Sequence, residues 1–301
     1  MSTNYADSCI KLNIMQQNQQ AILLIHCEDQ PGIIAAVTDF VHQHGGNIID
    51  LDQHTDTLRN KFYMRISWDT AHFDLDTSAI NKQFSEQLAD RFSMNWNLYT
   101  TGKPMRLALF VSKQLHCLYD ILGRWQTNEW EVEIPLIISN HTDAEHVSAK
   151  FNIDFHHLPI TKENKQEQEV KQQELLNDHS IDLVVLARYM QILSGDFIDA
   201  WRNRIINIHH SFLPAFPGAR PYHSAYERGV KIIGATSHYV TEDLDEGPII
   251  EQDIVRVTHR DDIERLVRKG RDLETLVLSR AVWKHIQHKT LVTDNRTIIF
   301  N

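Results

Sequence analysis

The chain has 301 residues, which is enough for about two domains of ordinary size. With 42% hydrophobic and 23% charged residues, its composition is that of a folded globular protein and excludes the disordered, collagen-like and low-complexity classes. Thirty Lys and Arg against forty Asp and Glu give a net charge of −10, which repels phosphate backbones and argues against a nucleic-acid partner. No stretch of about 18 apolar residues predicts a membrane span, and residues 1–19 lack a signal-peptide pattern, so we expect a cytoplasmic protein with no membrane partner.

Cysteine and histidine usage bounds the chemistry. Cys9, Cys27 and Cys117 are odd in number and far apart in the sequence, which favours reduced thiols over a disulfide framework. Eighteen histidines invite acid–base or metal chemistry, because histidine changes charge near neutral pH. The chain has no H-E-x-x-H or comparable ligand spacing, so we expect no metal, and zinc hydrolysis remains an alternative raised only by the number of histidines.

Residues 20–100 predict a small ferredoxin-like domain with the order βαββαβ. The apolar run 21–27 predicts a strand, residues 29–32 form a turn, and apolar residues at helical spacing then predict a helix that ends at Gly45 and Gly46. The later elements expected are strands at 47–55 and 61–68, a helix at 77–92 and a strand at 94–100. Polar residues 1–19 predict a flexible tail, and residues 101–104 predict a linker.

Residues 105–301 predict a doubly wound, Rossmann-like α/β domain with a mostly parallel sheet, because short apolar runs alternate with segments of helical period. The expected strands lie at 105–111, 133–139, 181–187, 204–210, 231–241 and 248–257, and the longer helices at 162–179 and about 261–288. Ligands of such folds bind beyond the carboxyl ends of the strands. The segments that follow the predicted strands are therefore where we look for a site.

Two of those segments carry polar side chains suited to acyl chemistry. Asn207 and His209 are two residues apart at a strand end, so both side chains can project into one cleft. An amide donor beside an imidazole can hold a developing oxyanion and move a proton. Asp245 lies in an acidic turn after the strand that carries His238, and its carboxylate could order a water molecule near His209.

The segment NIHHSFLPAFPGARPYHSAYERGVKIIGATSHYVTEDLDEGPIIEQD, residues 207–253, resembles the folate-dependent formyl transfer fold and in particular the formyltetrahydrofolate deformylase family. The N-x-H pair, the LPAFPGARPYH loop and the D-L-D-E-G-P turn appear in order. The segment AILLIHCEDQPGIIAAVTDFVHQHGGNI, which begins at residue 21, resembles the ACT domain that this family carries in front of its catalytic domain. The resemblance thus extends over residues 20–301.

The resemblance implies an enzyme that hydrolyses 10-formyltetrahydrofolate to formate and tetrahydrofolate, which supplies formate for purine synthesis and balances the one-carbon folate pools. It implies that Asn207, His209 and Asp245 form the catalytic trio, with His210 and His238 in support, and that no cofactor is needed beside the folate substrate. The folate pocket implied by the resemblance consists of the segment Arg188, Tyr189, Met190, Gln191, Ile192 and Leu193 and of the loop Val240, Thr241, Glu242, Asp243 and Leu244 up to Asp245.

For the ACT domain, the resemblance implies that a small amino acid binds as an effector and that paired domains build a homo-oligomer. The effector residues implied are Asp29, Gly32, Ile33, Asn47 and Ile48. Gly32 is expected because the backbone there approaches the ligand closely.

A departure from related glycinamide ribonucleotide formyltransferases favours water as the formyl acceptor. Those enzymes carry a glycine-rich loop after the first strand of this domain, and its backbone N–H groups hold the substrate phosphate. The equivalent stretch here, VSKQLHC at 111–117, has no glycine. Two alternatives stay open: a formyltransferase that acts on an amine acceptor, and a non-catalytic sensor of amino acids and folate.

Overall fold

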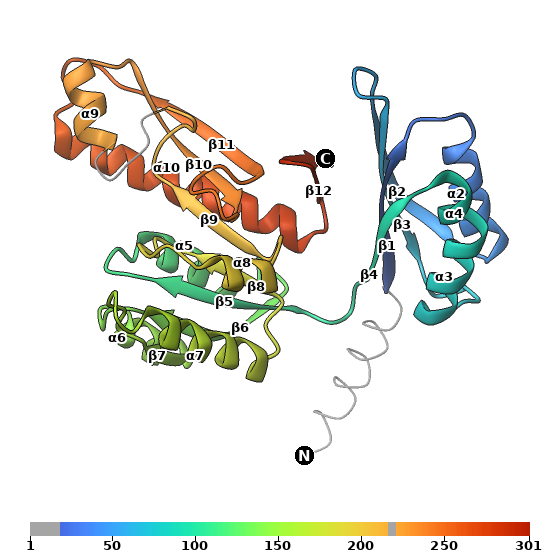
Figure 1. Ribbon diagram of the computed structural model, residues 1–301, viewed down its shortest axis with the longest axis horizontal. Helices are drawn as coiled ribbons and strands as arrows, with labels where there is room; N and C mark the ends of the chain where they lie inside the picture. The colour runs from blue at the N-terminus through green and yellow to red at the C-terminus, as the bar shows by residue number, and fades with distance from the viewer. Residues whose placement is uncertain (1–18, 216–220) are drawn as a thin grey trace. The chain divides into compact units, whose positions relative to one another are not determined.

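The computed structural model describes residues 19–215 and 221–301, which form two compact units (Figure 1). The first unit contains the described residues up to Pro104 together with Ile298–Asn301, and the second is Met105–Thr297. The predicted flexible tail falls outside the described residues except for Gln19, and so do residues 216–220 of the LPAFPGARPYH loop. Among the described residues, no helix combines the length and the apolar composition needed to cross a membrane.

The first unit is a four-stranded antiparallel sheet with helices on one face, in the order β2-β3-β1-β4. Its elements are β1 (Gln20–Glu28), α2 (Ile33–Gln43), β2 (Asn47–Asp56), β3 (Lys61–Asp69), α3 (Thr77–Phe84), η1 (Ser85–Ala89), α4 (Asp90–Phe92) and β4 (Asn95–Thr100). Alternate residues of β1, such as Leu23 and Ile25, pack with Val37 of α2 and Phe84 of α3 in one core. The predicted βαββαβ order is confirmed, although the predicted helix 77–92 is interrupted by a π-helical turn, η1.

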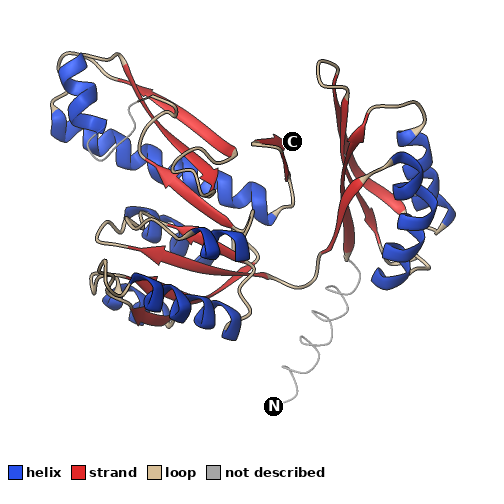
Figure 2. Cartoon of the chain, viewed as in Figure 1, coloured by secondary structure: helices blue, strands red, loops and turns tan. Residues whose placement is uncertain are grey.

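The second unit contains a seven-stranded sheet in the order β11-β10-β9-β8-β5-β6-β7. Figure 2 shows strands in red and helices in blue. Its strands are β5 (Met105–Val111), β6 (Val132–Ser139), β7 (Asp154–His157), β8 (Leu183–Leu186), β9 (Ile205–His209), β10 (Ile232–Tyr239) and β11 (Ile249–Arg256). The five strands from β9 to β7 are parallel, whereas β10 and β11 are antiparallel to their neighbours. The predicted mostly parallel α/β fold is confirmed.

Helices cover both faces of this sheet. They are α5 (His116–Gln126), α6 (Glu145–Phe151), α7 (Lys165–Asp178), α8 (Gly195–Ala200), α9 (Pro221–Arg228) and α10 (Ile263–Ile286). Phe110 and Leu186 pack with Leu176 of α7 and Phe197 of α8 on one face. The alternate strand residues, such as the fully buried Leu109, face the other side. The long helix α10 lies along β9, β10 and β11 and contacts α5.

The chain ends in a hairpin that the sequence pattern did not predict, formed by β12 (Thr290–Thr293) and β13 (Arg296–Ile299). Its last residues belong to the first unit: Phe300 is buried, and the Asn301 amide donates to Asp52 Oδ2 at 3.0 Å. The predicted second domain ran to residue 301, whereas the second unit of the structure ends at Thr297.

Candidate active site

The carboxyl ends of β5, β8 and β9 converge where the order of the strands reverses. The chain leaves β5 for β6 and β7 and then returns to β8 on the other side of β5. At such a switch point the connecting segments separate and leave a crevice for a ligand. Asn207 and His209 stand at the end of β9, Arg188 follows β8 and His116 follows β5.

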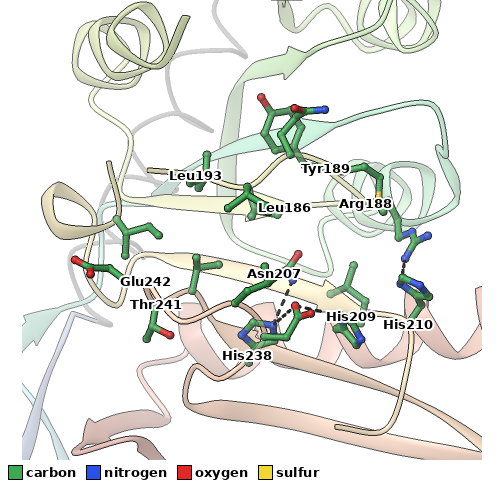
Figure 3. A pocket seen from close by; sticks show the side chains of 18 residues that line it. Leu186, Arg188, Tyr189, Leu193, Asn207, His209, His210, His238, Thr241 and Glu242 are labelled. Carbon is green, nitrogen blue, oxygen red and sulfur yellow. Dashed lines mark hydrogen bonds and ion pairs between the residues drawn. The ribbon is translucent and has the colours of Figure 1, made fainter. Parts of the chain in front are cut away.

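Asn207 and His209 reach the same crevice because residues two apart in a strand share a face. Both side chains line one pocket (Figure 3). Asn207 is half-buried, and His209 is only 6% exposed. His209 Nδ1 lies 3.2 Å from Asp245 Oδ1. The other ring nitrogen of His209, Nε2, is buried and has no hydrogen-bond partner within residues 19–215 and 221–301. Within the described residues, the imidazole of His209 therefore has a partner at Nδ1 and none at Nε2.

Asp245 reaches His209 by a route that differs from the predicted one. The sequence reading placed both residues at the same kind of strand end, but β10 runs antiparallel to β9, with Tyr239 paired to Ile206. The connection from Tyr239 to Pro248 therefore leaves the sheet beside the start of β9. It folds back over the sheet so that Asp245 meets His209 and lies 3.9 Å from His238 Nε2. Asp245 has a φ of 61°, a left-handed conformation that aspartate tolerates better than most residues.

The Asp245 carboxylate is held in its charged form. The hydrogen bond from His209 lowers the pKa of Asp245 below its usual value and outweighs the opposing effect of burial. At neutral pH, the pocket therefore presents a carboxylate and an imidazole 3.2 Å apart. This arrangement can orient a water molecule and take up its proton.

His238 determines which way the Asn207 amide faces. His238 Nδ1 lies 2.9 Å from the carbonyl oxygen of Tyr239, which can only accept, so Nδ1 carries the proton. Burial lowers the pKa of His238, so the ring is neutral at neutral pH and its Nε2 is an acceptor. Asn207 Nδ2, 3.3 Å from that atom, therefore donates one N–H to His238 and keeps the second for another acceptor.

The pocket has a volume of about 430 Å³, within the range of small-molecule sites. All the predicted catalytic, supporting and folate-binding residues line it except Asp243, whose backbone carbonyl instead accepts bonds from Thr241 and Glu246 within the turn. Met190, Ile192 and Leu244 line the pocket and remain more than half exposed, an apolar surface suited to a flat ligand. The lining residues that the sequence did not predict are Leu186, Ile198 and Ile208.

Arg188 lines the pocket, but its guanidinium is engaged inside the protein. Its Nη1 lies 2.8 Å from His210 Nδ1, and its Nε lies 3.4 Å from Glu274 Oε2. Glu274 lies on α10, far from the motifs of the sequence reading, and sequence spacing carries no signal for this contact. The structure thus links the predicted residues Arg188 and His210 to a buried carboxylate that the motifs did not indicate.

The predicted effector residues of the first unit form two separate groups. Asp29 is exposed, whereas the Ile33 side chain belongs to the core. Gly32 has a φ of 94°, and no described atom lies within 4 Å of where its Cβ would be, so a left-handed turn explains this glycine without a ligand. Asn47 and Ile48 are exposed at the start of β2, beyond the far end of α2, a helix about 16 Å long. One chain therefore does not bring these two groups together.

Comparison with known proteins gives matches to both units. The family model described as ACT domain matches residues 21–84, and the one described as Formyl transferase matches residues 105–282. A formyltetrahydrofolate deformylase of Synechocystis sp. is 57% identical over 284 residues, which are 94% of this chain and 99% of that protein. One of Bacillus subtilis is 51% identical over 93% of both chains. The crystal structure of a formyltetrahydrofolate deformylase from Pseudomonas syringae pv. tomato has 41% identity and a TM-score of 0.91, and covers 99% of this chain and all of that one.

Proposed function

The chain belongs to the formyltetrahydrofolate deformylase family, and from this premise we propose that Asn207, His209 and Asp245 hydrolyse the formyl group of 10-formyltetrahydrofolate in the pocket at the end of β9. The single observation that carries the proposal is the environment of His209. Its Nδ1 is paired with the Asp245 carboxylate, and its buried Nε2 has no hydrogen-bond partner among the described residues. A buried polar atom without a partner is costly, and a substrate oxygen would supply the missing bond.

In the proposed reaction, the formyl oxygen lies between Asn207 Nδ2 and His209 Nε2. Water, held by Asp245, attacks the formyl carbon, and the carbonyl oxygen becomes an oxyanion that accepts hydrogen bonds from Asn207 and protonated His209. The bond from the carbon to N10 then breaks. One proton of the water ends on N10, the other leaves to solvent through the Asp245–His209 pair, and formate and tetrahydrofolate are released.

The pocket also fits the rest of the substrate. The apolar side chains of Leu186, Ile198 and Val240 line its interior, and the backbone of the segment after β8 borders it. Flat heterocycles bind in sites of this kind, where a few polar groups fix the orientation. We assign the pterin ring to this part of the pocket, with the formyl group directed toward Asn207 and His209.

Formate release tests the proposal. Purified protein with 10-formyltetrahydrofolate in buffer, without an acceptor amine, is expected to release formate and tetrahydrofolate. Asn207→Ala removes one oxyanion donor and is expected to lower kcat by about 10²- to 10³-fold, with little change in the melting temperature because Asn207 is only half-buried. Release of formate by Asn207→Ala at the wild-type rate would defeat the assignment of Asn207, and absence of formate from the wild type would defeat the proposed reaction.

For the first unit, we propose an amino-acid effector and pairing with a second copy of the chain. The support is the match to the ACT domain and the separation of the two residue groups, since an effector that touches both Asp29 and Asn47 needs a second chain. Light scattering is expected to show a dimer or a larger oligomer, and at least one of the twenty amino acids is expected to change kcat or KM. A monomer, or activity unchanged by every amino acid, would contradict the corresponding part of the proposal.

A further inference from the structure

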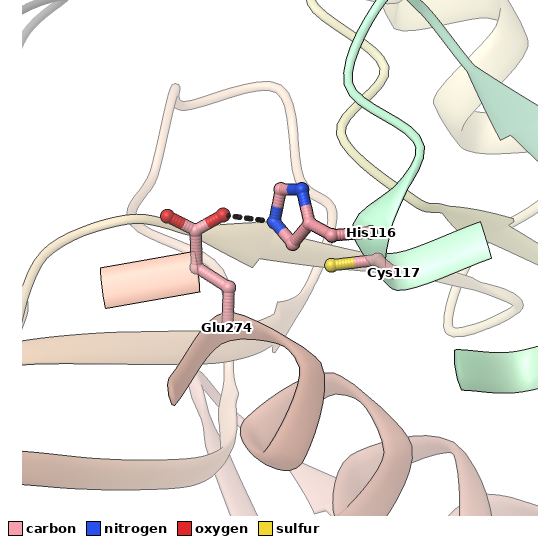
Figure 4. Close-up of side chains that lie close together, drawn as sticks. All are labelled: His116, Cys117 and Glu274. Atoms are coloured by element: carbon pink, nitrogen blue, oxygen red, sulfur yellow. Dashed lines mark hydrogen bonds and ion pairs between the residues drawn. The ribbon is translucent and has the colours of Figure 1, made fainter. Parts of the chain in front are cut away.

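A buried ionic cluster lies behind His210 and plays no part in the mechanism above. Its centre is Glu274 of α10, which is 1% exposed. Tyr222 donates a hydrogen bond to Glu274 Oε1 at 2.6 Å, and His116 Nε2 lies 2.7 Å from Oε2. Figure 4 shows the contact between His116 and Glu274. Arg188 Nε lies 3.4 Å from the same Oε2. The four residues come from α10, α9, α5 and the segment after β8, so only the complete fold assembles them.

Glu274 is ionised in spite of its burial. Burial alone would raise the pKa of its carboxyl group, but the hydrogen bonds from His116 and Tyr222 and the charge of Arg188 together bring that pKa below its usual value. Burial raises the pKa of Tyr222, so its hydroxyl stays a donor to the carboxylate. The cluster therefore contains a permanent negative charge beside a permanent positive one.

The distances alone would also allow His116, Cys117 and Glu274 to hold a metal ion, because their ligand atoms lie within 4.8 Å of one another. The chemistry of the surroundings is less suitable. Both oxygens of Glu274 already accept hydrogen bonds, and the guanidinium of Arg188 would repel a cation there. Burial also raises the pKa of Cys117, which disfavours the thiolate that binds metals. The residues thus suit an internal ion pair better than a metal site.

Two backbone features show that the fold accommodates this cluster at a cost. A Cβ at Gly270 of α10 would collide with the Tyr222 hydroxyl, so this helix carries a glycine where Tyr222 reaches Glu274. Glycine within a helix costs about 1 kcal/mol relative to alanine. Arg188 has a φ of 65°, an unfavourable conformation for a residue with a long side chain. Such strained positions cluster near functional sites.

The cluster acts on the active site through His210. Arg188 Nη1 can only donate, so His210 Nδ1, 2.8 Å away, must accept, and the ring is neutral with its proton on Nε2. Burial and the charges of Arg188 and His209 lower the pKa of His210 to about 4. The ring of His210 stacks on that of His209, with centroids 5.0 Å apart and planes inclined by 25°. An unprotonated ring is thus held firmly against the catalytic imidazole.

We propose that Glu274 and Arg188 are positioning residues, which hold His210 in one neutral tautomer and so keep His209 in place beside Asp245. This inference rests on the proposed function of His209. The charged and titratable groups around the two rings are Arg188, Glu274, Asp245, His238 and Tyr222. Glu274 balances the positive charge of Arg188, because without that carboxylate an uncompensated guanidinium would lie beside the two stacked imidazole rings.

The pH profile of Glu274→Gln tests the proposal. The substitution keeps the size of the side chain and removes its charge. We expect the alkaline limb of kcat to move toward lower pH by about one pH unit, with KM within twofold of wild type because Glu274 does not line the pocket. Glu251→Gln is the matched control. Glu251 of β11 pairs with Lys284 of α10, the helix that carries Glu274, and it lies outside the pocket. The pH profile of this variant should therefore match that of wild type. An unshifted profile for Glu274→Gln would overturn the proposal.

Histidine tautomers in the wild type provide a second test that does not depend on a variant. Nitrogen-15 spectra of ¹⁵N-histidine-labelled protein should show His210 with its proton on Nε2 and unchanged from pH 5 to pH 9. A proton on Nδ1, a titration of His210 near 6.5, or stoichiometric zinc lost in Glu274→Gln would overturn the inference. Formate release by the wild type is measured in the same experiment. If the wild type releases no formate, the proposed function is wrong. If it releases formate but the pH profile of Glu274→Gln is unshifted, only this inference is wrong.

Discussion

Asp245 is the residue on which the proposed chemistry depends most. It is the carboxylate hydrogen-bonded to His209, it lies near His238, and its backbone has the left-handed conformation that brings its side chain to them. Among uncharged residues, asparagine matches its shape and tolerates the same φ. The charge of this group can therefore be removed with little change in the backbone.

We expect Asp245→Asn to lower kcat by about 10²-fold or more, because an amide cannot take the proton of the attacking water. Its melting temperature should stay within a few degrees of wild type. Glu246→Gln is the matched control, since Glu246 is the exposed neighbour in the same turn and does not line the pocket. Formate assays on the two purified variants check this prediction, and equal rates would exclude a role for the Asp245 carboxylate.

For single residues, the sequence predicts the contacts that follow from the periodicity of one strand or helix. Asn207 and His209 share a face because strand periodicity requires it, and both line the pocket as expected. Glu274 could not be found in this way. Its partner Arg188 lies 86 residues earlier in the chain, and their meeting depends on how α10 packs across the sheet. The periodicity of a strand or a helix does not predict a contact between a residue of a helix and a residue in the loop after a distant strand.

At the scale of elements, the β10–β11 connection delivers Asp245 to the site. Its shape depends on Gly247, where a Cβ would collide with the carbonyl oxygen of Tyr239. A backbone atom cannot move aside as a flexible side chain can. Any larger residue at position 247 must therefore displace the turn that carries Asp245.

Gly247→Ala is expected to lower the free energy of unfolding by about 1–3 kcal/mol, as overpacked sites do, and to lower kcat as well. Gly123→Ala is the control, because Gly123 lies inside α5 with no described atom within 4 Å of its missing Cβ. That substitution should stabilise the protein by about 0.5–1 kcal/mol. Urea unfolding and formate assays compare the two, and a Gly247→Ala variant as stable and active as wild type would contradict the account of the turn.

Elements with a long periodic pattern are predicted well, and short or unusual ones are not. The strands β5, β6 and β9 match their apolar runs within two residues at each end. The sequence reading missed β7, whose four residues DFHH alternate too briefly to show a period. It also missed the antiparallel direction of β10, because an apolar run does not encode its orientation.

At the scale of the whole molecule, buried histidines make stability depend on pH. Burial lowers the pKa of His210 to about 4 and also lowers the pKa of His238. In the unfolded chain both rings would titrate near the ordinary value of about 6.5. As the pH falls below that value, the unfolded chain gains protons that the folded protein does not bind, so stability is present above about 6.5 and is lost toward pH 4.

For His210 alone, lowering the pH from 7.5 to 5 should reduce the free energy of unfolding by about 2 kcal/mol. Urea unfolding at a series of pH values measures this slope. His210→Gln keeps a hydrogen-bonding side chain but cannot titrate, so its slope should be smaller than that of wild type. Identical slopes for the two proteins would show that His210 is not held neutral in the folded state.

The sequence predicts the two units and their order along the chain, because strand-like and helix-like segments alternate differently in residues 20–100 and in residues 105–301. The return of Ile298–Asn301 to the first unit could not be predicted, since four residues carry no periodic signal and the contact of Asn301 with Asp52 joins residues 249 positions apart. The proposed pairing of ACT domains rests on the family resemblance, because the apolar runs of one chain carry no signal for a second copy.

In the proposed reaction, water and no amine accepts the formyl group. The most direct measurement follows 10-formyltetrahydrofolate in H₂¹⁸O with excess glycinamide ribonucleotide present. We expect one formate for each tetrahydrofolate formed, with one ¹⁸O atom in each formate and no formylated amine. Tetrahydrofolate formed without formate, with the formyl group on the amine, would contradict it.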